Sequence, residues 1–369
     1  MAKKWPRAGR VSAALLLSVA LASGAAACSG GDASPAPGTP VSGTATRGAF
    51  TPIKADAKVG LSFPVGSKVE PALNAALKKA GFSVESRFAR TGDDQDRYVG
   101  MLLESKPAVL VIEAVDTGRL KMRLDQAEKA GVVVIAATTL PMDDDTIDYY
   151  VGADPKLRGE AQAEAVLTGV TGRRTQGPPR VEFMAGRSDD VAAKIQYDAT
   201  FAKLQPKLDD KSLEMPSGGK DFGRSALAAP SDAKAKMAAL LKDKYGDQAP
   251  EGVVAPDDEA AVAATEAVAE AKRTLPYVVG ARATYQGVRD LMQGRLGATT
   301  WDDPAALAAS IAQLVGDLKG KDWPVTDKTS INTGRRDVGT RMLSPIAQVT
   351  RANAASVLKG DPELVKLTG

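Results

Sequence analysis

Residues 108–139 read AVLVIEAVDTGRLKMRLDQAEKAGVVVIAATT, and this stretch decides the fold. Two nearly continuous apolar runs rich in β-branched residues, AVLVIEAV and VVVIAATT, flank a helical pattern that closes at Gly131. Strands that are apolar on both faces are typical of parallel sheets covered by helices on both sides. A glycine at the end of a helix suits the left-handed turn that leads into the next strand. The stretch therefore predicts one β–α–β unit of a parallel sheet.

The same alternation extends outward on both sides of this unit. Before it, KVGLSFPV at 58–65 and FSVESRFA at 82–89 each precede a helical pattern. After it, a second series runs from IDYYVGADP at 147–155 to the amphipathic helix at 305–320. Two successive series predict an α/β fold with two doubly wound parallel-sheet lobes. Ligands of open α/β sheets bind beyond the carboxyl ends of the strands, so we expect the site in the cleft between the lobes.

The start of the chain has the pattern of a secretory signal peptide. Residues 1–27 combine a basic opening, MAKKWPRAGR, with an apolar run and small residues. The only cysteine, Cys28, follows directly, and the sequence AAAC resembles the lipobox of bacterial lipoproteins, whose cysteine is lipidated. Residues 28–56 are rich in Gly, Ser, Pro, Thr and Ala, so we expect a lipidated Cys28 and a disordered tether. The alternative is a plain secreted protein whose cysteine is incidental.

Composition excludes several classes of function. Without the four cations that precede Cys28, 44 basic residues face 45 acidic ones, so charge offers no case for nucleic-acid binding. The chain has no histidine, which removes Ser–His–Asp and Cys–His nucleophiles and the usual zinc sites. It contains no phosphate-binding G-x-x-x-x-G-K-[ST] loop, and the acidic run Asp143–Asp145 lacks the spacing of a calcium loop. We therefore expect a binding protein, not an enzyme, without cofactor or metal.

Four stretches resemble the type I periplasmic sugar-binding proteins, and within them the xylose-binding branch of ABC importer receptors. They are AVLVIEAVDTGRLKMRLDQAEKAGVVVIA (108–136), DDDTIDYYVGADPKLRGEAQAEAV (143–166), GVVAPDDEAAVAATEAV (252–268) and INTGRRDVGTRMLSPIAQVTRAN (331–353). The resemblance covers residues 57–354. It implies two lobes joined by three crossovers, which close by a hinge around one sugar.

The resemblance places the three crossovers near residues 154, 301 and 329. The N-terminal lobe would then comprise residues 57–154 and 302–329. The C-terminal lobe would comprise residues 155–301 and 330–354, and residues 355–369 would form a C-terminal tail.

The candidate ligand-binding residues lie in segments that match the cleft of the family, but several depart from its pattern. Thr138 and Thr139 stand where the family has an Asp–Arg pair, and Arg282 replaces an aspartate. Asp302 replaces a lysine or glutamine. Asp258 retains the aspartate of a Ser-Asn-Asp motif. The full candidate set is Phe63, Thr138, Thr139, Arg187, Asp190, Asp257, Asp258, Arg282, Trp301 and Asp302.

Three of these candidates have alternative interpretations. Phe63 and Trp301 would supply apolar walls to the cleft, but Phe63 is equally suited to the core. Asp258 would contact the ligand, cap the helix that follows it, or do both. The choice depends on which way each side chain points, which the pattern alone leaves open.

Three arginines, Arg187, Arg224 and Arg282, fall in loops expected at the cleft. Guanidinium groups bind carboxylates and phosphates through paired hydrogen bonds, so one hypothesis is a positive focus for a sugar acid or a phosphorylated sugar. The alternative is a set of solvated loop arginines balanced by Asp190 and Asp302.

The resemblance and the leader together predict a lipid-anchored solute-binding protein that captures a sugar or sugar-like ligand and delivers it to an ABC importer. Its partners would be the ligand, an ABC permease and the membrane through the anchor, without nucleic acid. We expect a monomer at the outer face of the bacterial cell membrane. The alternative is a ligand sensor or scaffold lipoprotein with the same fold and a lapsed or altered sugar pocket.

Overall fold

The computed structural model describes residues 50–174, 176–327 and 330–369. The expected signal peptide, Cys28 and the first part of the expected tether, residues 28–49, lie outside the described residues. Within the described ranges, no helix has both the length and the apolar character that crossing a membrane requires.

The last residues of the expected tether pack against the folded body. The ring centroids of Phe50 and Trp323 lie 4.8 Å apart, and the N–H of Ile53 donates to the carbonyl of Leu318 at 3.0 Å. Phe50 and Ile53 both contact the core of the first sheet. The expectation that the disordered tether extends to residue 56 is therefore wrong, because these two side chains bury apolar surface against the body.

The described residues form a first sheet of seven strands in the order β10–β11–β5–β4–β3–β1–β2. The strands are β1 (Lys58–Pro64), β2 (Ser83–Ala89), β3 (Val109–Ile112), β4 (Val133–Ala137), β5 (Tyr149–Ala153), β10 (Ser330–Asn332) and β11 (Asp337–Leu343). Neighbouring strands are parallel except β10 and β11, which pair antiparallel. We call this sheet and its helices the first lobe.

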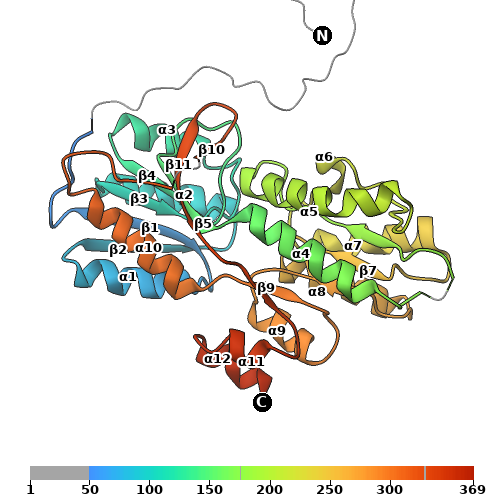
Figure 1. Cartoon of the computed structure of the whole chain (residues 1–369). Coiled ribbons are helices and arrows are strands. Elements are labelled where there is room, and N and C mark those ends of the chain that lie inside the picture. The colour runs from blue at the N-terminus through green and yellow to red at the C-terminus, as the bar shows by residue number, and fades with distance from the viewer. Residues whose placement is uncertain (1–49, 175, 328–329) are drawn as a thin grey trace, which may run out of the picture. The chain divides into compact units, whose positions relative to one another are not determined.

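Helices cover both faces of the first sheet (Figure 1). They are α1 (Val69–Lys79), α2 (Gly92–Glu104), α3 (Lys121–Lys129) and α10 (Pro304–Asp317). Val109 and Val111 of β3 share a core with α1 and α10, whereas Leu110 shares one with α2 and α3. Because successive side chains of a strand point to opposite faces, this alternation is what an apolar, fully covered strand requires.

The second lobe has a smaller parallel sheet, β6 (Val181–Phe183), β7 (Gly252–Val254) and β8 (Tyr277–Val279). One face packs on α4 (Pro155–Val170) and α5 (Val191–Asp209), and the other on α7 (Asp232–Leu240) and α8 (Asp258–Glu270). The remaining elements are α6 (Phe222–Ser225), η1 (Leu241–Tyr245), α9 (Tyr285–Met292), β9 (Thr299–Trp301), β12 (Ala347–Val349), α11 (Ala354–Val357), α12 (Pro362–Val365) and η2 (Lys366–Thr368). The α/β class with two helix-covered parallel sheets, expected from the sequence, is confirmed.

The chain passes between the lobes three times. The crossings lie between β5 and α4 at Asp154, between β9 and α10 at 302–303, and between β11 and β12 at 344–346. Asp154 accepts hydrogen bonds from the N–H groups of Lys156 and Leu157, which fixes the start of α4 directly after the crossing. The loops that enter the space between the lobes therefore follow the carboxyl ends of strands in both sheets.

The third crossing and the C-terminal tail differ from expectation. Residues 330–343 belong to the first lobe and not to the second, because β11 pairs with β5 in parallel and extends the first sheet. The third crossing accordingly lies after Leu343 and not near residue 329. Residues 355–369 are not a detached tail, since Leu358 and Leu364 are fully buried in the core of the second lobe.

Candidate functional site

A cavity of about 160 Å³ lies where loops of the two lobes meet. Its first-lobe wall consists of Ala114, Val115, Thr138 and Thr139. Its second-lobe wall contains Arg158, Gly186, Arg187, Asp190, Ala192, Ala193, Gln196, Leu227, Ala229, Pro230, Pro256, Asp257 and Arg282. The walls thus combine short aliphatic side chains with charged groups of both signs, and no aromatic residue of the described chain lines the cavity.

Two residues that line the cavity have unusual backbone conformations. Thr138, directly after β4, has φ 62°, and Arg282, shortly after β8, has φ 81°. This left-handed region is costly for residues with a Cβ and especially for a β-branched threonine. The conformation is held in place by the surroundings, since the hydroxyl of Tyr150 donates to the carbonyl of Thr138 at 3.3 Å.

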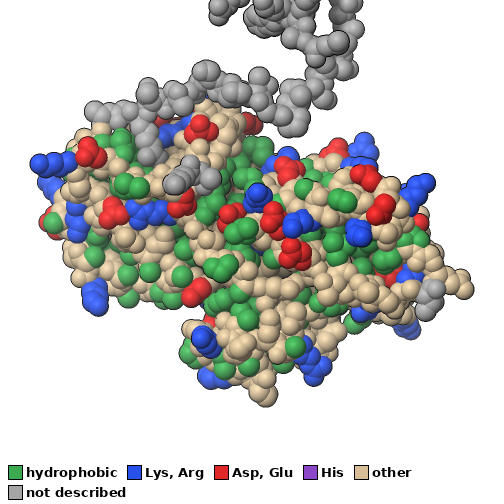
Figure 2. Space-filling model, viewed as in Figure 1, with side chains coloured by type: hydrophobic (Ala, Val, Ile, Leu, Met, Phe, Trp, Pro, Cys, Tyr) green, Lys and Arg blue, Asp and Glu red, His purple; other side chains and the backbone are tan. Residues whose placement is uncertain are grey.

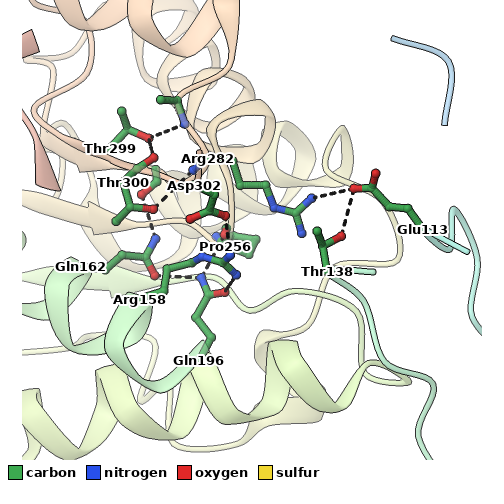
Figure 3. Close-up of polar contacts among 12 residues, drawn as sticks. Glu113, Thr138, Arg158, Gln162, Gln196, Pro256, Arg282, Thr299, Thr300 and Asp302 are labelled. Atoms are coloured by element: carbon green, nitrogen blue, oxygen red, sulfur yellow. Dashed lines mark hydrogen bonds and ion pairs between the residues drawn. The ribbon is translucent and has the colours of Figure 1, made fainter. Parts of the chain in front are cut away.

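A contact between Arg282 and Glu113 spans the two lobes (Figure 3). Nη1 of Arg282 lies 4.0 Å from Oε1 of Glu113, which also accepts a hydrogen bond from the Thr138 hydroxyl at 2.9 Å. Burial raises the pKa of Glu113, and the positive charge of Arg282 offsets part of that rise. Arg282 therefore faces a carboxylate of the opposite lobe across the cavity.

A second arginine, Arg158, is buried in the cavity wall beside the second crossing. Its side chain is 2% exposed and pairs with Asp302, and its Nη1 donates to Oε1 of Gln196 at 3.4 Å. Nε of Arg158 and Oδ1 of Asp302 are buried and have no hydrogen-bond partner among the described residues. Gln196 also donates to the side chain of Gln162 at 2.9 Å, so a polar network runs from α4 to α5 (Figure 3).

The sequence analysis missed Arg158 as a site residue. The residue lies in the first turn of α4, four positions after the cap Asp154, where an arginine normally points to solvent. The available signals were separate: Arg158 closely follows the first crossing, and the unexpected acid Asp302 lies at the second.

Arg187 lines the cavity, but four of its five N–H groups are already engaged. Nε and Nη2 bind Asp189 at 2.9 and 2.7 Å, Nη2 also binds Asp116 at 2.9 Å, and Nη1 donates to the carbonyl of Ala228 at 2.9 Å.

Oδ1 of the neighbouring Asp190 accepts from the N–H of Leu140 at 3.0 Å, and burial raises the pKa of Asp190.

The two adjacent aspartates of the β7–α8 loop have different roles. Asp257 lines the cavity and caps α8, accepting from the N–H of Ala260 at 2.8 Å. Asp258 is fully buried behind it and accepts hydrogen bonds from the Thr299 hydroxyl at 2.6 Å and the Thr284 N–H at 2.7 Å. Burial raises the pKa of Asp258 to about 7. The expectation that Asp258 contacts a ligand or caps α8 is wrong, because its carboxylate is enclosed by the loop before α9.

The structure brings together Thr138, Thr139, Arg187, Asp190, Asp257 and Arg282 at the cavity. It places the other four candidates elsewhere, including Asp258, which is fully buried. Phe63 is fully buried in the core with α1 and α10, and Trp301 packs in the core of the second lobe, because both rings bury more apolar surface there than in a polar cleft. Asp302 lies behind the wall, paired with Arg158.

The hypothesis of a three-arginine focus for an anion is not supported by this geometry. The Arg224 side chain is 90% exposed beside Asp221 and does not line the cavity. Arg187 is satisfied by two aspartates, which leaves Arg282 as the least engaged of the three. The positive charge at the cavity is thus compensated by neighbouring carboxylates.

Comparison with known proteins found a matching family model and similar sequences. A family model described as a periplasmic binding protein domain matches residues 64–322. The multiple sugar-binding periplasmic receptor ChvE of Rhizobium radiobacter is 29% identical over 76% of this chain and 82% of its own. The D-xylose-binding periplasmic protein of Escherichia coli (strain K12) is 27% identical over 64% of this chain and 68% of its own.

Solved structures show the same fold. An ABC transporter solute binding protein from Clostridium phytofermentans with bound β-D-glucose has a TM-score of 0.76 at 24% identity, covering 84% of this chain and 99% of that chain. A carbohydrate transporter solute binding protein from Chloroflexus aurantiacus in complex with D-glucose has a TM-score of 0.70 at 23% identity. The match covers 83% of this chain and 96% of that chain. At these identities the likeness concerns the fold and not the ligand.

Proposed function

Because the chain belongs to the periplasmic binding protein family, we propose that it captures a sugar or sugar-like ligand between its two lobes and delivers it to an ABC importer. In this proposal, residues 57–154 and 302–343 form one lobe, and residues 155–301 and 347–369 form the other. Its sugar-binding relatives are transport receptors, so the chain acts by binding and not by catalysis.

The observation that supports capture most strongly is the cavity between the lobes. It is enclosed by loops after β3 and β4 on one side and after β6, β7 and β8 on the other, where ligands of open α/β sheets bind. Its volume of about 160 Å³ lies below the range of drug-sized pockets, so it suits a single small ring or polyol and not an oligosaccharide. Asp257, Arg282 and Thr139 offer acceptors and donors for hydroxyl groups.

Anchoring and delivery are further parts of the proposal. The solved relatives described as ABC transporter solute binding proteins support a permease as partner. A lipid on Cys28 would keep the receptor at the outer face of the cell membrane, close to that permease. A receptor without the lipid would diffuse away. Labelled fatty acid should be incorporated into the wild-type chain and not into Cys28→Ser; labelling of both would contradict the anchor.

The test of capture is thermal unfolding of the full chain with candidate ligands. We expect a neutral sugar such as D-glucose or D-xylose, at about one hundred times its dissociation constant, to add about 2.7 kcal/mol and raise Tm by several degrees. Arg282→Ala, which removes a donor from the wall, should reduce this shift, whereas Arg224→Ala, at an exposed residue that does not line the cavity, should not. D-glucuronate and D-glucose 6-phosphate test the anionic class in the same assay.

A second candidate function is favoured by one observation. The wall lacks the aromatic ring on which a sugar face commonly packs, and its two most buried guanidinium groups are engaged by protein carboxylates. A sensor or scaffold with an altered pocket would have these features. Absence of any thermal shift with neutral and anionic sugars would favour this second function over capture.

A further inference from the structure

One cluster of ion pairs joins the two lobes at the edge of the cavity. Arg187, in the loop between β6 and α5, binds Asp116 in the loop between β3 and α3. The same guanidinium binds Asp189 of its own loop through two nitrogens at 2.9 and 2.7 Å. Arg187 thus binds one carboxylate of each lobe at once. Its planar guanidinium, with several N–H donors, suits this double contact better than the ammonium group of a lysine would. Positive and negative side chains are interspersed over the visible face of the body (Figure 2), so this cluster does not belong to a surface patch of a single charge sign.

The carboxylate held by Arg187 also binds the backbone of the first lobe. Oδ2 of Asp189 accepts from the N–H of Gly118 at 3.1 Å. The carbonyl of Asp189 accepts from the N–H of Met142 at 2.9 Å and from the hydroxyl of Thr117 at 3.3 Å. Asp189 therefore reaches two separate loops of the first lobe, and Arg187 fixes the orientation of its side chain.

These contacts join the lobes through Arg187, which also lines the cavity. Four of the five N–H groups of Arg187 bind Asp189, Asp116 and the Ala228 carbonyl, which leaves one N–H, on Nη1, for any other partner. Other ion pairs also join the lobes, among them Arg282 with Glu113, which is longer at 4.0 Å, and Lys68 with Asp361 at 2.6 Å, neither of whose residues lines the cavity. Among the described arginines that line the cavity, Arg187 is accordingly the one with the most hydrogen bonds to protein groups.

We propose that Arg187 is a positioning residue that holds the lobes closed and thereby slows their opening. Arg187 and Asp116 are 30% and 28% exposed, so their attraction is moderate and screened by salt. Opening is then faster at high ionic strength and when either partner of the pair is removed.

The test is hydrogen exchange of the full chain without any sugar, read in peptides that contain Gly118 and Met142. Arg187→Ala and Asp116→Ala leave the acceptor of both amides, Asp189, in place, so faster exchange reports opening and not a deleted hydrogen bond. We expect both variants to exchange about two- to five-fold faster in these peptides. In the wild type, raising the salt from 0.1 to 1 M should produce a similar increase, and in the variants it should produce little change.

The matched control is Arg180→Ala. Arg180 forms a comparable fork on Glu251, at 3.2 and 3.1 Å, but both residues lie in the second lobe. This variant should leave the exchange of Gly118 and Met142 unchanged. The inference is overturned if Arg187→Ala and Asp116→Ala both exchange like the wild type, if Arg187→Ala alone has an effect, or if Arg180→Ala has the same effect. No sugar is present, so this outcome is independent of whether D-glucose or D-xylose binds.

Discussion

At the residue scale, the cavity walls are held by side chains whose charges are compensated within the protein. Arg158 pairs with Asp302, Arg187 with two aspartates, and Arg282 faces Glu113. Two wall residues, Thr138 and Arg282, also have left-handed backbones. Such conformations persist only where surrounding contacts impose them, and they are typical of ligand-binding regions. The walls are therefore held in shape by contacts within the protein.

The buried Asp258 should make stability depend on pH. Its pKa is about 7 in the folded protein against an ordinary value of 3.8, so folding favours the protonated form. The stabilisation is fully present below about pH 4 and is lost as the pH rises through 7. Asp258→Asn stays neutral, so its stability relative to the wild type should increase by about 1–3 kcal/mol between pH 5 and pH 8. Urea unfolding at both pH values measures this change, and an unchanged difference would contradict the assignment.

At the element scale, the second lobe depends on close contact between α4 and β8. Gly169 of α4 lies against one side of the Tyr277 ring, and Gly297 lies against the ring as well. A Cβ at either glycine would overlap the ring. Because the ring occupies this space, α4 can lie against Tyr277 only at a position without a side chain. The glycine in the helix is therefore a packing requirement and not a flexible joint.

Two helical glycines provide a matched test of this packing. Gly169→Ala should destabilise the protein by about 1–3 kcal/mol, although alanine is the better helix former, because the methyl group overpacks the ring of Tyr277. Gly316→Ala in α10, where a Cβ would meet no atom within 4 Å, should stabilise by about 0.5–1 kcal/mol. Denaturant midpoints of the two variants should move in opposite directions. A stabilising Gly169→Ala would refute the close contact.

At the scale of the whole molecule, the chain returns to each lobe after leaving it. The strand β11 joins the first sheet beside β5, and the segment after it crosses back to pair β12 with β9. The helices α11 and α12 then add Leu358 and Leu364 to the second core. Each lobe is thus completed by segments from late in the chain, and the three crossings form the only described covalent links between the lobes.

Removal of residues 355–369 tests this completion. We expect the truncated chain to lose about 3 kcal/mol or more, because two fully buried leucines leave the core of the second lobe. Hydrogen exchange should increase in β6 to β8 and remain as in the wild type in β1 to β4. Lys359→Ala, at an exposed position of the same segment, is the control and should have little effect. Retention of the wild-type midpoint after truncation would show that the segment is dispensable.

Much of the fold was predictable because strands and helices leave local patterns. The runs at 108–139 became β3, α3 and β4, and the alternation of apolar and helical stretches correctly indicated two helix-covered sheets. The assignment of residues 330–343 was wrong, because short strands at a crossing have the same local pattern in either lobe. Only pairing with β5 decides their place.

The sequence by itself determined the α/β class, the two series of strands, the absence of histidine chemistry and the loops that line the cavity. Only the tertiary structure decided which polar groups in those loops are free and which are engaged. Asp116 and Arg187 are 71 residues apart, and Arg158 and Asp302 are 144 apart. Periodicity depends on neighbours within a few residues, whereas the partner of a charge is fixed by long-range packing. The sequence therefore shows which residue types lie in the cavity loops, but it does not show which of their polar groups are paired within the protein.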